Sequence, residues 1–157
     1  MGQAGEHERF YRSPLGVLCV RLCSRGLAAV RFLPDDDDGA GRDPAPDPIG
    51  KEFDRYFHDP GHRFSLKLCA GGTPFQKRVW RLLQAIPSGS VITYGELARL
   101  SDSGPRAVAG ACGANPLPIV VPCHRVVAAE GLGGYMGRSE RGLCIKRWLL
   151  RHERAIS

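Results

Sequence analysis

The stretch Pro116-Leu-Pro-Ile-Val-Val-Pro-Cys-His-Arg-Val-Val127 encloses a short β-branched run between prolines and then delivers a Cys-His pair. The Ile-Val-Val run is too short for a helix and predicts a brief, buried, extended segment. Pro122 fixes its own φ and disfavours a helix before it, so Cys123 is expected at a rigid turn. His124 is a candidate base for converting the thiol into a nucleophilic thiolate. The pair is the predicted chemical centre of the chain.

The composition is that of an ordinary globular chain. Its 157 residues allow one core or two small lobes, and 43% of them are hydrophobic and 24% charged. No apolar run approaches the ~18 residues of a membrane helix, and the N-terminus lacks the apolar centre of a secretory signal. We therefore expect no membrane partner, a cytoplasmic location (nuclear in a eukaryote) and six free thiols.

The net charge of +6 is unevenly distributed along the chain. Residues 1–68 hold ten Lys/Arg against eleven Asp/Glu, whereas residues 69–157 hold twelve against five. This asymmetry suggests that the second half meets a polyanion, although a solubilising surface explains the charge equally well.

The first half, residues 1–70, is predicted to be a small α/β lobe. Residues 1–12 are polar and expected to fray. A Pro-, Gly- and Asp-rich loop at 34–48 carries Asp35 to Asp38, which fit a plain acidic loop better than a metal site. The predicted elements are a β-hairpin, a helix and a further strand, at residues 15–23 with 27–33, 49–57 and 64–68.

The second lobe, residues 73–157, opens with a strong helix-start signal. Thr73 is a plausible N-cap, Pro74 suits the first helical position, and Gln76 completes a capping box. Two further short helices at 95–100 and 105–114 are separated by a tight turn, the outline of a helix-turn-helix. The chain closes with an amphipathic helix whose basic side chains, Lys146, Arg147, Arg151 and Arg154, are expected to face outward.

The helix predicted at 105–114 is unusually rich in Ala, Gly and Cys after Arg106. Small residues let a backbone approach a bulky partner closely, as in a narrow DNA groove. Tight packing against another helix remains a second explanation.

A Cys-His pair needs a third group to orient the imidazole, usually a carboxylate. Spacing alone leaves Glu153, Glu130, Glu96 and Asp102 open. A structural zinc site is disfavoured, because no Cys-x-x-Cys occurs and adjacent Cys123 and His124 bind one ion awkwardly. Cys19 and Cys23 alternate on one strand face and are predicted core thiols. A cysteine protease is a rival without a sign of a cleft or an oxyanion hole.

The segment Pro122-Cys-His-Arg125, preceded by Asn115-Pro-Leu-Pro and followed by Val-Val, resembles the active-site signature of O6-alkylguanine-DNA alkyltransferases. The resemblance runs from Thr73 through Val91-Ile-Thr-Tyr-Gly-Glu-Leu97 and Arg106-Ala-Val to Lys146-Arg-Trp-Leu-Leu-Arg-His-Glu153. It implies a small N-terminal sheet lobe of ribonuclease H-like outline and a helical lobe with a winged-helix-like helix-turn-helix. Residues before Thr73 match only in size and outline.

The resemblance also implies roles for individual residues. Cys123 would take an alkyl group from O6 of guanine or O4 of thymine, while His124, aligned by Glu153, would remove the thiol proton through a water. Arg106 would fill the stack vacated by the flipped base, and Tyr94 would help rotate it. The remaining implied substrate and DNA contacts are Ala107, Ala111, Asn115, Pro118, Arg125, Val126, Tyr135, Met136 and Lys146.

The sequence therefore predicts a single-turnover DNA alkyltransferase, monomeric and without cofactor or metal, that acts on double-stranded DNA from the minor groove. One departure concerns residues 136–142, a loop longer and more charged than the family's. The alternatives are an alkyltransferase-like lesion sensor that does not react, although such proteins typically lack the Cys, and a hydrolase that turns over repeatedly.

Overall fold

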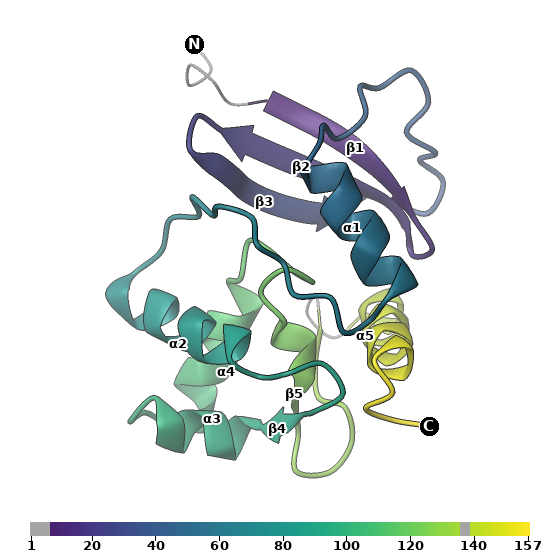
Figure 1. Ribbon diagram of the computed structural model, residues 1–157. Helices are drawn as coiled ribbons and strands as arrows, with labels where there is room; N and C mark the ends of the chain where they lie inside the picture. Colours follow the sequence, from purple (N-terminus) through teal and green to yellow (C-terminus); the bar gives the residue numbers. More distant parts are fainter. Residues whose placement is uncertain (1–6, 136–138) are drawn as a thin grey trace. The chain divides into compact units, whose positions relative to one another are not determined.

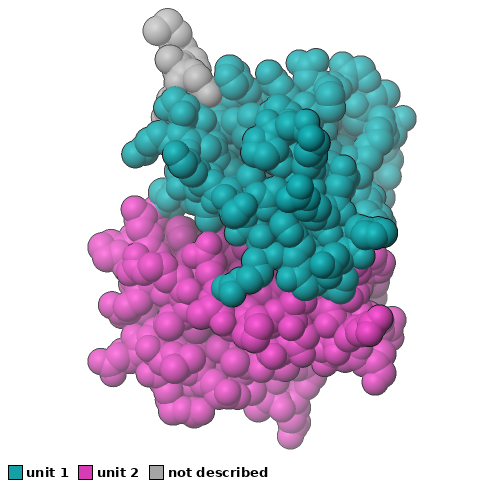
Figure 2. Space-filling model, in the orientation of Figure 1, with its two compact units in different colours: residues 1–71 teal, residues 72–157 magenta. Residues whose placement is uncertain are grey.

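The computed structural model describes residues 7–135 and 139–157 and divides the chain into two compact units, residues 1–71 and 72–157 (Figure 2). Within the described ranges, no helix combines the length and the apolar character that crossing a bilayer requires. The chain is a mixed α/β protein, as the sequence predicts.

Unit 1 is built on an antiparallel sheet of order β1-β2-β3, with β1 at His7–Ser13, β2 at Gly16–Cys23 and β3 at Gly26–Phe32. The predicted hairpin is confirmed as β2 and β3. The expectation that residues 1–12 fray is wrong for β1, which pairs with β2 from His7↔Leu22 to Ser13↔Gly16. Backbone pairing holds this edge strand, whose flanking charged residues mask the β-propensity of Phe10 and Tyr11.

The predicted helix is confirmed as α1, Ile49–His58, which lies across the sheet (Figure 1). Phe53 and Tyr56 on α1 are fully buried. Tyr11 of β1 stacks on Phe53 with ring centroids 5.3 Å apart, and its hydroxyl donates to the carboxylate of Asp54 at 2.6 Å. Aromatic packing therefore joins helix and sheet into one small core.

The prediction of a strand at residues 64–68 is wrong. Only an isolated bridge between Leu27 and Leu68 forms there. The backbone N–H of Ser65 donates instead to the buried carboxylate of Glu52 at 3.0 Å, which also accepts the Ser65 hydroxyl at 2.8 Å. The carboxylate thus takes a donor that a strand would use in its ladder.

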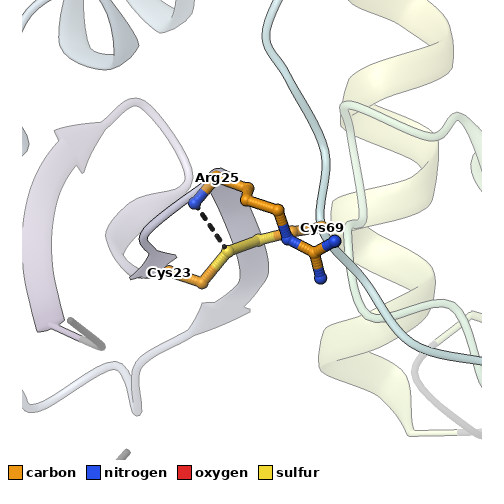
Figure 3. The surroundings of a disulfide bond; sticks show 3 residues. All are labelled: Cys23, Arg25 and Cys69. Carbon is orange, nitrogen blue, oxygen red and sulfur yellow. Dashed lines mark hydrogen bonds between the residues drawn. A yellow bond between two sulfur atoms is a disulfide. The ribbon is translucent and has the colours of Figure 1, made fainter. Parts of the chain in front are cut away.

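The expectation of six free thiols is also wrong, because Cys23 and Cys69 form a disulfide (Figure 3). Two backbone hydrogen bonds, Leu27 N–H to Lys67 C=O and Cys69 N–H to Leu27 C=O, both 2.9 Å, bring residue 69 beside the β2–β3 turn. A pairing across 46 residues of chain depends on this tertiary contact, which spacing does not reveal. Cys19, by contrast, is the predicted buried thiol.

Unit 2 contains four helices among its described residues and two short parallel strands. The elements are α2 Pro74–Gln84, β4 Ile92–Thr93, α3 Tyr94–Leu100, α4 Pro105–Gly113, the 3₁₀ turn η1 Cys123–Arg125, β5 Val126–Val127 and α5 Glu140–His152. The predicted capping box of α2 is confirmed, and Thr73 accepts from the Gln76 N–H at 3.0 Å. Helices α3 and α4, joined by a tight turn, form the predicted helix-turn-helix.

Candidate active site and DNA-binding helix

The segment between α4 and Cys123 is folded back on itself. Asn115 clamps it from both sides, because its amide nitrogen donates to Val121 C=O at 2.8 Å and its oxygen accepts from Leu117 N–H at 2.9 Å. Val121 N–H bonds to Leu117 C=O at 2.8 Å. The segment is buried as predicted, but it is a turn and not an extended strand, because these bonds close it locally.

Cys123 opens the 3₁₀ turn η1 and is 9% exposed. Burial raises the pKa of its thiol, and the Asn115 hydrogen bond and the Lys146 charge only partly oppose this effect. The resting side chain is therefore a thiol, and a nearby base is needed to make it a nucleophile.

His124 is fully buried beside that thiol and bonds through Nε2 to Glu153 Oε2 at 2.8 Å. Of the four carboxylates left open by spacing, Glu153 is the one that the fold brings to the imidazole. Burial lowers the pKa of His124, so the ring is neutral near pH 7. With Nε2 donating to a carboxylate, Nδ1 carries the lone pair, and Nδ1 bonds to no other described residue. The imidazole can therefore accept a proton at Nδ1.

Glu153 is gripped by Arg125 in a bidentate pair, with Nε to Oε1 and Nη2 to Oε2 both at 2.9 Å. Burial alone would raise the pKa of Glu153, but the hydrogen bonds and charges of His124 and Arg125 lower it to about 2. Arg125 Nη1 also donates to Ile86 C=O at 2.6 Å. The expected DNA contact of Arg125 is thereby corrected, since its guanidinium is buried and fixes the carboxylate.

Lys146 does not face outward as the amphipathic pattern of α5 predicts. It is fully buried, and Nζ donates to Val126 C=O at 2.7 Å and Gly134 C=O at 3.0 Å. The ammonium lies 5.9 Å from the ring centroid of Tyr94. Burial lowers the pKa of Lys146 to about 8. A buried cation thus stands near the Cys123 thiol, where it favours the thiolate.

Helix α4 exposes small residues on one face and buries them on the other. Arg106 and Ala107, in the first turn of α4, are exposed. Ala111 is buried, and its carbonyl accepts the Trp80 indole N–H at 2.9 Å. An added Cβ at Gly110 would meet nothing within 4 Å. The tight-packing explanation is therefore confirmed for Ala111, which packs on Trp80 of α2, whereas the face with Arg106, Ala107 and Gly110 is exposed, and its fit to a DNA groove stays a prediction.

The remaining predicted pocket residues differ in how far they are buried. Val126 is fully buried, Tyr135 is 5% exposed and Pro118 is half-buried. The backbone comes so close at Gly133 that a Cβ there would lie 2.9 Å from the Tyr94 ring. Met136 lies outside the described residues. Of the loop predicted at 136–142, residues 140–142 belong to α5, which Ser139 caps.

Sequence reasoning missed three residues that shape this site. Trp80 anchors α4 through its indole, Cys112 is a second buried thiol near Cys123, and Ile119 has a φ of 75°. Electrostatic coupling to Cys123 contributes to a Cys112 pKa of about 12, after the larger effect of burial. No sequence pattern flags these roles. Among the described residues, no cluster of three His, Cys, Asp or Glu side chains forms a metal site.

Comparison with known proteins gives matches over both units. The profile of the 6-O-methylguanine DNA methyltransferase, DNA binding domain, matches residues 74–155. A methylated-DNA–protein-cysteine methyltransferase of Salmonella typhimurium is 54% identical over 92 residues, which are 57% of this chain and 52% of that protein. The chain thus aligns with about half the length of this relative.

Two other relatives match nearly the whole chain. A methylated-DNA–protein-cysteine methyltransferase of Rattus norvegicus is 35% identical over 90% of this chain and 78% of its own length. The crystal structure of Mycobacterium tuberculosis OGT in complex with DNA superposes with a TM-score of 0.78 at 34% identity, covering 95% of this chain and 93% of that one. The chain therefore belongs to the 6-O-methylguanine DNA methyltransferase family.

Proposed function

We propose that this protein repairs O6-alkylguanine in duplex DNA by moving the alkyl group onto Cys123 Sγ. The observation that carries the proposal is the buried His124–Glu153 pair, whose histidine directly follows Cys123, in the same unit as a helix-turn-helix. Relatives named as methylated-DNA–protein-cysteine methyltransferases and a related structure with bound DNA support it.

The proposed reaction is one displacement. His124 Nδ1 takes the thiol proton through a bridging water, and Glu153 stabilises the imidazolium that results. The thiolate then attacks the alkyl carbon, the carbon–oxygen bond breaks, and its electron pair stays with guanine. The imidazolium returns its proton through the water to the guanine anion, so guanine and His124 both end neutral. A thioether has no ready leaving group, so Cys123 is consumed and each chain reacts once.

Recognition is proposed to proceed by base flipping from the minor groove, because the target atom lies inside the duplex. Exposed Arg106 would fill the vacated stack, and the open face around Ala107 and Gly110 admits close backbone approach. Arg106→Ala should impair repair in duplex far more than reaction with free O6-benzylguanine. Equal losses on both substrates would remove the flipping role. We further propose O4-alkylthymine as a second substrate and a monomeric active form.

Intact-protein mass spectrometry after incubation with a duplex containing one O6-methylguanine tests the function. The expected result is a gain of one methylene per chain that stops there and maps to Cys123, with no gain in Cys123→Ala although DNA binding persists. Tight lesion binding without a mass gain would indicate a non-reacting sensor. Repeated turnover of an ester or amide substrate without DNA would indicate a hydrolase.

A further inference from the structure

Ile119 has a backbone conformation that its side chain disfavours. Its φ is 75°, in the left-handed region where a β-branched residue is a genuine outlier. Pro118 precedes it, and the bond from Val121 N–H to Leu117 C=O at 2.8 Å closes a five-residue turn around both. A turn residue with φ in this range is ordinarily Gly. Ile119 thus occupies a glycine position.

The other described non-glycine residues with positive φ have a local explanation that Ile119 lacks. Asp102 and Arg154 each directly follow the C-cap of a helix, α3 and α5, where a left-handed residue commonly terminates the helix. Ile119 follows no helix. Strain of this kind persists only where the surroundings enforce it, and it concentrates at functional sites.

The surroundings of Ile119 do enforce the turn. Its side chain is 2% exposed, between Leu117 at 1% and Val120 at 7%. Two residues further on, the carbonyl of Val121 accepts two hydrogen bonds, from the side-chain N–H of Asn115 and from the backbone N–H of Cys123, both at 2.8 Å. Rotating Ile119 to a negative φ would swing this carbonyl away and break both bonds. The turn is thus mechanically coupled to Cys123.

We propose that Ile119 is a positioning residue: its buried side chain holds a left-handed turn that sets Cys123 against Asn115 and His124. The catalytic meaning of this role rests on the proposed alkyl transfer. The coupling of the turn to the thiol rests on the geometry alone and is testable without DNA.

Two truncations of Ile119 separate the effect of its backbone conformation on stability from the effect of its side-chain packing. Ile119→Ala and Ile119→Gly both remove the buried side chain, but only Gly adopts positive φ without strain. At an ordinary buried position the Gly variant is the less stable one. At 119 the order should invert, with a folding equilibrium constant roughly fivefold larger for Gly than for Ala. Val120→Ala and Val120→Gly are the matched control at negative φ, where Ala should be the more stable.

Reactivity of Cys123 gives the second measurement. Iodoacetamide labelling followed over pH, and mapped to Cys123 by peptide mass spectrometry, should be the same in Ile119→Gly and wild type. Ile119→Ala should show a different pH dependence of labelling, because relaxation of the turn changes both the burial that raises the pKa of Cys123 and the Asn115 hydrogen bond that lowers it. Single-turnover transfer from O6-benzylguanine should fall at least roughly tenfold in Ile119→Ala, and Ile119→Val should restore it.

The outcomes are distinct. Gly more stable than Ala at 119, together with retained Cys123 reactivity, supports the proposal. Ala more stable than Gly at 119, as at 120, would reduce Ile119 to a packing residue and overturn it. Measurements with trimethylamine N-oxide keep marginal variants folded. If wild type transfers no alkyl group, the proposed function fails, while stability and iodoacetamide labelling still decide the role of Ile119.

Discussion

Glu153→Gln tests whether the buried carboxylate holds the site together. The substitution keeps the shape but removes the charge that pairs with Arg125 and His124 at 2.8–2.9 Å. It leaves the Arg125 guanidinium buried without a counter-charge. Removing one partner of a buried pair costs about 3–5 kcal/mol. We therefore expect Glu153→Gln to lower the free energy of unfolding by about 3–5 kcal/mol at neutral pH.

The pKa of Glu153 gives a second route to the magnitude. It falls from the ordinary 4.5 to about 2 on folding, and each unit corresponds to about 1.4 kcal/mol, so the ionised form contributes about 3 kcal/mol. Because the folded pKa lies below the unfolded one, this stabilisation is complete above pH 4.5 and is lost as the pH falls toward 2. Near pH 2 a protonated Glu153 resembles the Gln variant.

Urea unfolding of wild type and Glu153→Gln between pH 3 and pH 7 is the assay. The difference should be about 3 kcal/mol at pH 7 and shrink steadily below pH 4.5. Arg125→Met completes a double-mutant cycle, in which the double variant should lose less than the sum of the singles. A difference independent of pH, or additive single effects, would refute the reasoning. Single-turnover transfer should also slow by roughly 10²–10⁴ in Glu153→Gln.

Three further predictions concern other contacts. Reduction of the Cys23–Cys69 disulfide, which spans 46 residues, should lower the free energy of unfolding by up to about 4 kcal/mol. Urea unfolding with and without dithiothreitol measures this loss. The control is Cys23→Ser, whose stability should not respond to the reductant. The pKa of Lys146 is about 8 in the folded protein against 10.5 for a free side chain, so the unfolded chain binds more protons between these two pH values. The stability of wild type relative to Lys146→Met should therefore rise by up to about 3 kcal/mol across this pH range. A stability difference that does not change with pH would contradict burial as the cause. Trp80→Phe removes the donor to Ala111 C=O and should cost about 1–3 kcal/mol in thermal unfolding, whereas unchanged stability would show that this bond does not hold α4.

Local signals in the sequence predicted the helices of unit 2 well. The Thr73 capping box, with Pro74 and Gln76, fixes the start of α2 by chemistry contained within four residues. The β2–β3 hairpin likewise follows from two strand patterns and a short turn. The position of Cys123 at a rigid turn follows from Pro122. These features depend on neighbours in the chain, so one sequence suffices to read them.

Features that depend on distant partners were not predictable. Lys146 lies on the polar side of an amphipathic pattern, and its burial becomes intelligible only with the carbonyls of Val126 and Gly134 in place. Arg125 stands next to the nucleophile in sequence but turns to a carboxylate 28 residues away. Ile119 is a strong β-former held in a turn by tertiary packing. These three positions therefore lie around Cys123, as expected where local preference yields to function.

Burial of Cys123 has a consequence for the selectivity of the proposed transfer. Because burial raises the pKa of the thiol, the resting protein presents a weak nucleophile to small electrophiles in solution. Neutral His124, held by Glu153, supplies a proton acceptor inside the site, and Lys146 stabilises the thiolate there. Reactivity thus depends on a substrate that reaches the buried sulfur and aligns with it. In the proposed single-turnover reaction, this arrangement reserves the thiol for an alkyl group delivered into the site and protects it from wasteful modification.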